Sequence, residues 1–242
     1  GSAPLTIIAT LMTLPEKSAG ARMLSHLPGD DDAALFRDLL PQAQALQRSI
    51  DPATTLATAG HPLVTLKGIV RPKARPPKMP AHNSAPADPF AVDEPFRPGP
   101  PTLASVEAAF RYLVEWEHDT ATGHLKTDAA SQEWTVRNVG TSLSASAFAS
   151  GPEEVPVVEC VVEHSYTAPE EEIRNWWPES ENQPGEQNFT QPLIRTVKLR
   201  ASLSLPRSGA VVLAASQLIT AEFLSSGDSE PLRVILFLNL QP

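Results

Sequence analysis

The chain has 242 residues, of which 41% are apolar and 19% charged, a composition typical of a globular protein with a buried core. The net charge of −9 argues against a nucleic-acid partner, because phosphates would be repelled. No apolar run reaches about 18 residues, so we expect no transmembrane helix. The single cysteine, Cys160, excludes a disulfide framework, and its apolar surroundings predict a buried side chain.

The sequence of residues 3–70 predicts a strand, then a helical segment, and then more strand structure. The stretch 4–14 is rich in Ile, Leu and Thr, as strands are. The sequence "GDDDAALFRDLL" begins with aspartates, which cap helix N-termini, and its leucines recur at helical spacing. We expect a shorter helix near 18–27, and we expect Pro41 to kink the main helix or start another. Two strands separated by a turn then cover 53–70.

Residues 71–101 predict a proline-rich excursion or linker. The stretch 72–101 holds ten of the 25 prolines and no regular hydrophobic pattern, which favours extended backbone. Its approach, "KGIVRPKARPPK", carries five basic side chains and no acid. We favour a solvated linker over a contact with an anionic polymer or a membrane surface.

Residues 102–242 predict an antiparallel β part that packs with 3–70 as one domain. "VEAAFRYLVEWEHD" alternates strictly and is rich in aromatic residues, which favours a strand over a helix. "GTSLSASAF" and "VPVVECVVEHSY" predict one hairpin. "RTVKLRASLSLPRSGAVVLAASQL", residues 195–218, predicts a second hairpin that is apolar on one face and hydroxylated or cationic on the other. "LRVILFLNL" is apolar on both faces, so it belongs in the middle of a sheet.

The order of these pieces resembles the core domain of the secretin family, the ring-forming outer-membrane channels of type II secretion and type IV pilus systems. "PLTIIATLMTLPE" is similar to the family's first strand, "LATAGHPLVTLKGIV" to its next strand pair, and "VGTSLSASAF" to its "VGTTLEVTPTV". Residues 195–219 follow the family's last hairpin, with Ala214-Ala215 where the family has Gly-Gly. The family's membrane-facing lip sequence is missing, so we expect no membrane insertion.

The resemblance implies the fold class: α+β, predominantly antiparallel β (a secretin-like sheet or a β-sandwich), with a helical N-terminal segment. It also implies a non-catalytic structural component of the bacterial cell envelope, in the periplasm or associated with the outer membrane. The implied partners are other secretion or pilus components and, in a homo-oligomer, further copies of the chain.

The sequence contains no nucleophile motif, phosphate-binding glycine loop or metal-protease motif, so we predict no enzyme, cofactor or metal site. The candidate interaction residues are Trp176 and Trp177 on a polar loop, and Lys198 and Arg200 on the polar face of 195–218. An alternative function is a β-sandwich adhesin or glycan-binding module that uses the two tryptophans, although these could also fold back as a lid on the sandwich. A hydrolase of unrecognised type is a third hypothesis.

Overall fold

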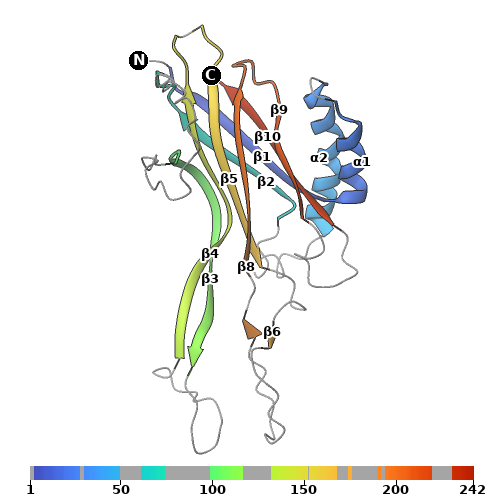
Figure 1. Cartoon of the computed structure of the whole chain (residues 1–242), viewed down its shortest axis with the longest axis vertical. Coiled ribbons are helices and arrows are strands. Elements are labelled where there is room, and N and C mark those ends of the chain that lie inside the picture. Colours follow the sequence, from blue (N-terminus) through green and yellow to red (C-terminus); the bar gives the residue numbers. More distant parts are fainter. Residues whose placement is uncertain are drawn as a thin grey trace, which may run out of the picture.

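The structure, a computed structural model, describes residues 3–27, 30–49, 61–74, 99–116, 132–151, 153–167, 174–175, 190–191, 194–219 and 231–242. Two four-stranded antiparallel sheets pack face to face, and two helices lie on the outer side of one of them (Figure 1). Sheet A has the strand order β2-β1-β10-β9, and sheet B has the order β3-β4-β5-β8. The predicted fold class, predominantly antiparallel β with a helical N-terminal segment, is confirmed.

Sheet A joins the two ends of the chain. Its strands are β1 (Leu5–Pro15), β2 (Leu63–Val70), β9 (Val212–Ile219) and β10 (Leu232–Gln241). β10 lies between β1 and β9 and is antiparallel to both. Its residues 234–238 are all buried, because one face meets sheet B and the other meets the helices. The predicted central position of this strand is confirmed.

Sheet B comes from the middle of the chain. Its strands are β3 (Thr102–Trp116), β4 (Gln132–Phe148), β5 (Val157–Thr167) and β8 (Ile194–Ser204). The strand at β3 and the β4–β5 hairpin are confirmed. A separate two-residue ladder joins β6 (Arg174–Asn175) to β7 (Thr190–Gln191).

β3 and the first half of β4 leave sheet B as a two-stranded ribbon (Figure 1). β5 pairs with β4 only from Gly140 onward, so the ribbon begins there. Gly140 has a φ of 141°, and a Cβ at this position would lie 2.1 Å from the carbonyl oxygen of Val106. Only glycine tolerates this backbone and this close approach of β3.

The helices α1 (Glu16–Ser25) and α2 (Asp32–Ser49) cover part of sheet A and bury a second, smaller core. Phe36 of α2 packs edge-on against Phe237 of β10, with 5.1 Å between ring centroids. α2 continues through Pro41, whose side chain is exposed. Of the two alternatives for this proline, the start of another helix is therefore wrong, and a kink stays a prediction. Neither described helix has the length and apolar character needed to cross a membrane.

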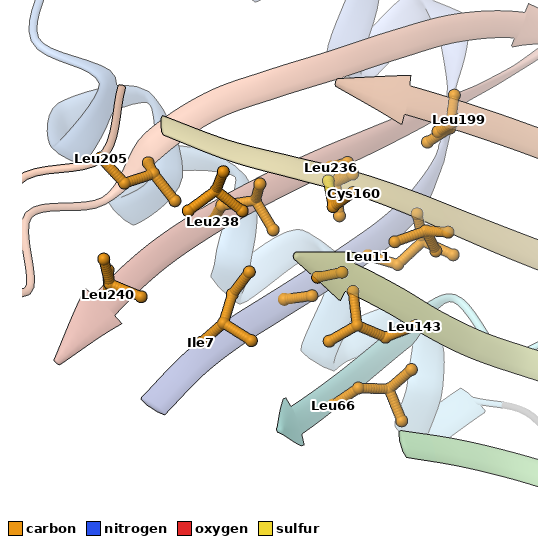
Figure 2. Packing of buried hydrophobic residues seen from close by; sticks show 14 of the residues in the cluster. Ile7, Leu11, Leu66, Leu143, Cys160, Leu199, Leu205, Leu236, Leu238 and Leu240 are labelled. Carbon is orange, nitrogen blue, oxygen red and sulfur yellow. The ribbon is translucent and has the colours of Figure 1, made fainter. Parts of the chain in front are cut away.

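The main core lies between the sheets (Figure 2). Alternate side chains from both sheets enter it, and the residues labelled in the figure are Ile7, Leu11, Leu66, Leu143, Cys160, Leu199, Leu205, Leu236, Leu238 and Leu240. The expected burial of Cys160 is confirmed, at 2% exposure. The alternation that predicts the faces of β8 is also confirmed, because Val197 and Leu199 are buried while Lys198 and Arg200 are exposed.

The predicted hairpin over 195–218 is wrong in its pairing. Both strands exist, but β8 belongs to sheet B and β9 to sheet A. β8 pairs with β5 as far as Leu205, whose N–H donates to the carbonyl of Pro156 at 3.0 Å. The chain then crosses between the sheets, and the N–H of Gly209 donates to the carbonyl of Leu240 at 3.0 Å. The alternation of apolar and polar residues shows which side chains of a strand face the core, but it does not show which strand is its hydrogen-bonded neighbour. Two alternating runs joined by a short turn therefore predict a hairpin even where, as here, the two strands belong to different sheets.

Several predicted features lie outside the described residues: the first strand of 53–70, most of the excursion 71–101, and both Trp176 and Trp177. At the beginning of the excursion, Lys73 crosses to sheet B and forms a β-bridge to Phe148. Its N–H donates to the carbonyl of Ala147 at 2.9 Å. The proposed domain boundaries stay a prediction.

Candidate functional site

The outer face of sheet B is polar, and no described helix lies on it (Figure 1). The side chains on this face alternate with the core residues along β4, β5 and β8, and hydroxyls are the commonest group among them. The polar residues are Ser142, Ser144, Ser146, Glu159, Glu163, Ser165, Thr196, Lys198, Arg200, Ser202 and Ser204, and the half-buried Phe148, Val157 and Val161 share the face. The face therefore suits contact with water or with a polar partner surface.

Cross-strand contacts hold part of this face together. The Lys198 ammonium donates to the Glu163 carboxylate opposite it on β5, and both side chains are about two-fifths exposed. A hydrogen bond of 2.8 Å joins the hydroxyls of Ser165 and Thr196. Within the described part of the chain, no carboxylate forms an ion pair with Arg200. Arg200 is therefore the cation on β8 that is best placed to meet a charge on a partner.

The backbone of β8 presents a row of polar groups at the outer edge of sheet B. The bond from Leu205 to Pro156 shows that this pair is a hydrogen-bonded one, and such pairs alternate along an antiparallel ladder. Residues 197, 199, 201 and 203 therefore direct their N–H and C=O groups to β5. Thr196, Lys198, Arg200, Ser202 and Ser204 direct theirs to the opposite side, where the described part of the chain supplies no strand.

β3 forms the other edge of sheet B in the same way. The N–H of Ala145 donates to the carbonyl of Pro101 at 3.1 Å, which fixes the alternation along β4. After the bulge near 102–104, Ser105, Glu107 and Ala109 direct their backbone groups away from β4. Glu107 is exposed, and its carboxylate accepts a hydrogen bond from Asn138 Nδ2 at 3.3 Å. No described strand pairs with this edge.

Beneath the polar face, the core holds two titratable side chains, Cys160 and His164, in their neutral forms near neutral pH. Burial raises the pKa of the Cys160 thiol to about 11, so it stays protonated and unreactive near neutral pH. The imidazole Nδ1 of His164 is hydrogen-bonded to the Thr141 hydroxyl at 2.7 Å, and burial together with the charge of His61 lowers its pKa to about 4. In the described ranges, no group of three or more His, Cys, Asp and Glu side chains is placed to hold a metal ion.

The structure places two of the four predicted interaction residues. Lys198 and Arg200 lie together on the exposed face of β8, whereas Trp176 and Trp177 lie outside the described residues. The glycan-binding alternative rests on the tryptophans and stays a prediction. Sequence reasoning missed Glu107 and the edge positions of β3 and β8, because edge position depends on pairing between distant segments; the alternation of β3 was the available signal.

Comparisons with known proteins include a structural likeness to a secretion complex. No protein-family model and no curated protein matches the chain. A solved structure of the Klebsiella pneumoniae type II secretion system outer membrane complex, with PulD, PulS and the PulC HR domain, is similar at 12% sequence identity and a TM-score of 0.28. The match covers 98% of this chain and 38% of the chain in that complex. Membership of the secretin family stays a prediction from the sequence.

Proposed function

We propose that the chain is a non-catalytic structural component of a secretion or pilus apparatus in the bacterial cell envelope, and that copies of it assemble through the edges of sheet B. The sequence resemblance to secretins supports the envelope role. The single observation that carries the assembly is the pair of edge strands, β8 and β3, which have no outer partner in the described part of the chain. An unprotected edge strand is a template for pairing with another chain.

The strand order favours a head-to-tail contact, in which β8 of one copy pairs with β3 of the next. Sheet B has four strands, each antiparallel to its neighbour, so this junction continues the antiparallel alternation. Contacts of this kind generate rings when the rotation between copies closes. On both strands, the residues with outward backbone groups also have side chains on the polar face. A continuous ladder therefore keeps the polar and apolar faces in line.

Charge selects one register for this junction. When Arg200 of one copy lies opposite Glu107 of the next, an exposed cation meets an exposed anion on the same face. The same register places Ser202 opposite Ser105. Lys198, which already contacts Glu163 of its own copy, lies opposite the small side chain of Ala109.

The test removes one backbone donor from the β8 edge. Ser202→Pro deletes an N–H that β5 does not use, and proline is tolerated on edge strands at such positions. Ser202→Ala is the matched control, because it removes the hydroxyl and keeps the N–H. Sedimentation velocity should show oligomers for the wild type and Ser202→Ala, and monomers for a folded Ser202→Pro. A monomeric wild type, or a Ser202→Pro variant that assembles normally, would overturn the proposal.

A further inference from the structure

The β9 edge of sheet A differs from the β8 edge because a side chain already occupies it. Asp32, the first residue of α2, accepts a hydrogen bond from the backbone N–H of Leu213 through Oδ2, at 3.0 Å. Its other carboxylate oxygen lies 2.7 Å from Nε2 of His26, which follows α1. One carboxylate thus ties both helices to an edge strand.

The Leu213 amide is available to Asp32 because β9 bulges at this point. Leu236 pairs with Ala215, whereas Phe237 pairs with Leu213, so Ala214 has no partner on β10. Bulges interrupt the hydrogen-bond ladder and bend the strand, and natural edge strands use them to discourage pairing. The bulge and the carboxylate act at the same place on β9.

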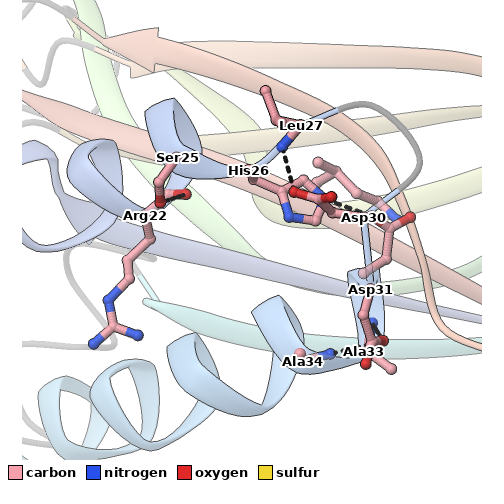
Figure 3. Close-up of polar contacts among 10 residues, drawn as sticks. Arg22, Ser25, His26, Leu27, Asp30, Asp31, Ala33 and Ala34 are labelled. Atoms are coloured by element: carbon pink, nitrogen blue, oxygen red, sulfur yellow. Dashed lines mark hydrogen bonds and ion pairs between the residues drawn. The ribbon is translucent and has the colours of Figure 1, made fainter.

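The neighbouring acids hold Asp32 in position. Asp31 caps α2, because its Oδ1 accepts the N–H groups of Ala33 and Ala34 at 3.0 and 3.1 Å (Figure 3). Asp30 Oδ2 accepts the N–H of Leu27 at 2.7 Å, which links the residues that follow α1 to those that precede α2 (Figure 3). Since the other two acids satisfy the local backbone, Asp32 can reach β9.

We propose that Asp32 guards the β9 edge, so that copies of the chain associate through sheet B and not through sheet A. The inference rests on the proposed function for the identity of the partner, a second copy. The strand that the guard excludes is β2 of that copy. The bond from the Thr13 N–H to the Pro62 carbonyl, at 2.7 Å, fixes the alternation of β2, so Leu63, Thr65, Lys67 and Ile69 direct their backbone groups outward. The last three of these side chains are exposed.

The test uses Ser202→Pro as the background, because that substitution closes the β8 edge. Adding Asp32→Ala should restore self-association, now through β9, whereas Asp32→Asn keeps an acceptor oxygen and should leave the protein monomeric. Ser216 lies opposite Ile235, at a position whose N–H points away from β10. Adding Ser216→Pro to the Asp32→Ala variant should therefore return it to monomers in sedimentation velocity.

A folded Ser202→Pro/Asp32→Ala variant that stays monomeric would overturn the guard, as would association that Ser216→Pro does not reduce. Amide hydrogen exchange at Leu213 covers the case in which Asp32→Ala fails to fold. This amide should be protected in the Ser202→Pro protein and in its Asp32→Asn derivative, and fast exchange in the Ser202→Pro protein also overturns the inference. If the proposed function is wrong, the wild type will be monomeric or Ser202→Pro will assemble normally. Both results differ from those that overturn the role of Asp32.

Discussion

At the scale of single residues, His164 shows how burial affects stability. Its side chain is 4% exposed at the inner face of β5 and is bonded to Thr141 of β4. Burial is the main cause of its lowered pKa, about 4, and the charge of His61 adds to it. The folded protein therefore excludes a proton that the unfolded chain binds below its ordinary pKa of 6.5.

We predict that this imidazole makes the protein less stable in mild acid. Because the folded pKa is depressed, the stabilisation is fully present above pH 6.5 and is lost progressively as the pH falls towards 4. The full loss is on the order of 3 kcal/mol. Urea denaturation at pH 7 and pH 5 measures the part lost over that interval, about 2 kcal/mol, with His164→Gln as the comparison. An equal loss of stability in the wild type and in His164→Gln over this range would contradict the assignment to His164.

Gly68 permits a close approach between the two sheets. A Cβ at this position on β2 would lie 2.5 Å from Cβ of Leu103 on β3, so no side chain fits without a shift. We predict that Gly68→Ala lowers the free energy of unfolding by about 1–3 kcal/mol, as overpacking does. The effect should shrink in the presence of Leu103→Gly, which removes the contacted Cβ, and Gly151→Ala is the control because nothing lies within 4 Å of it. Additive effects of the two substitutions would show that this contact is not the cause.

At the scale of elements, an ion pair fixes the start of α1 to β10. Arg233 donates from two guanidinium nitrogens to the two carboxylate oxygens of Glu16, at 2.7 and 2.8 Å. The hydrogen bonds from Arg233 lower the pKa of the Glu16 carboxyl, and the same contact raises the pKa of the guanidinium. Two-point contacts of this kind fix orientation as well as distance.

We predict that Glu16→Gln loosens α1 without disturbing the sheets. Hydrogen exchange of the α1 amides should quicken, and the free energy of unfolding should fall by about 1 kcal/mol, because the pair is partly exposed. Arg37→Gln is the control, since its ion pair with Asp31 spans 3.7 Å and is largely exposed. Unchanged exchange in α1, or equal effects of both substitutions, would argue against this role.

Individual elements were the most predictable part of the fold. Alternation identified β3 and the faces of β8, and the uniformly apolar sequence of β10 indicated its central position. The aspartates before α2 predicted its capped N-terminus. The pairing of β8 with β5 could not be read in the same way, because it depends on contacts between segments far apart in the chain.

At the scale of the whole molecule, the proposed junction predicts a charge-swap result. Arg200→Glu should weaken assembly by about tenfold, because it places an acid opposite Glu107 of the next copy. Glu107→Arg should weaken it similarly, and the double variant should recover most of the loss. Light scattering against concentration measures the effect. Glu153→Arg, in the turn before β5, makes the same change in net charge as Glu107→Arg and is the control for that variant. No recovery in the double variant would contradict the register.

The sequence predicted the chemistry of the candidate site better than its location. The polar face with Lys198 and Arg200 followed from strand periodicity alone. The position of this face at an edge of sheet B did not follow from periodicity, since a strand is an edge strand only in relation to the pairing of all the other strands. The same applies to Asp32, whose aspartate neighbours indicated a helix cap but not a contact with Leu213 on β9.

Site-directed disulfide cross-linking tests whether β8 of one copy pairs with β3 of the next. Ser202 and Ser105 face each other across the proposed junction, where Cα atoms about 5.5 Å apart suit a disulfide. The Ser202→Cys/Ser105→Cys protein, oxidised at neutral pH, should give a series of covalent multimers larger than dimers on a non-reducing gel. Neither single variant should do so, and the parent, whose Cys160 is buried, should stay monomeric on the gel. A double variant that gives only monomers, or only the dimers that Ser202→Cys forms alone, would contradict head-to-tail assembly through β8 and β3.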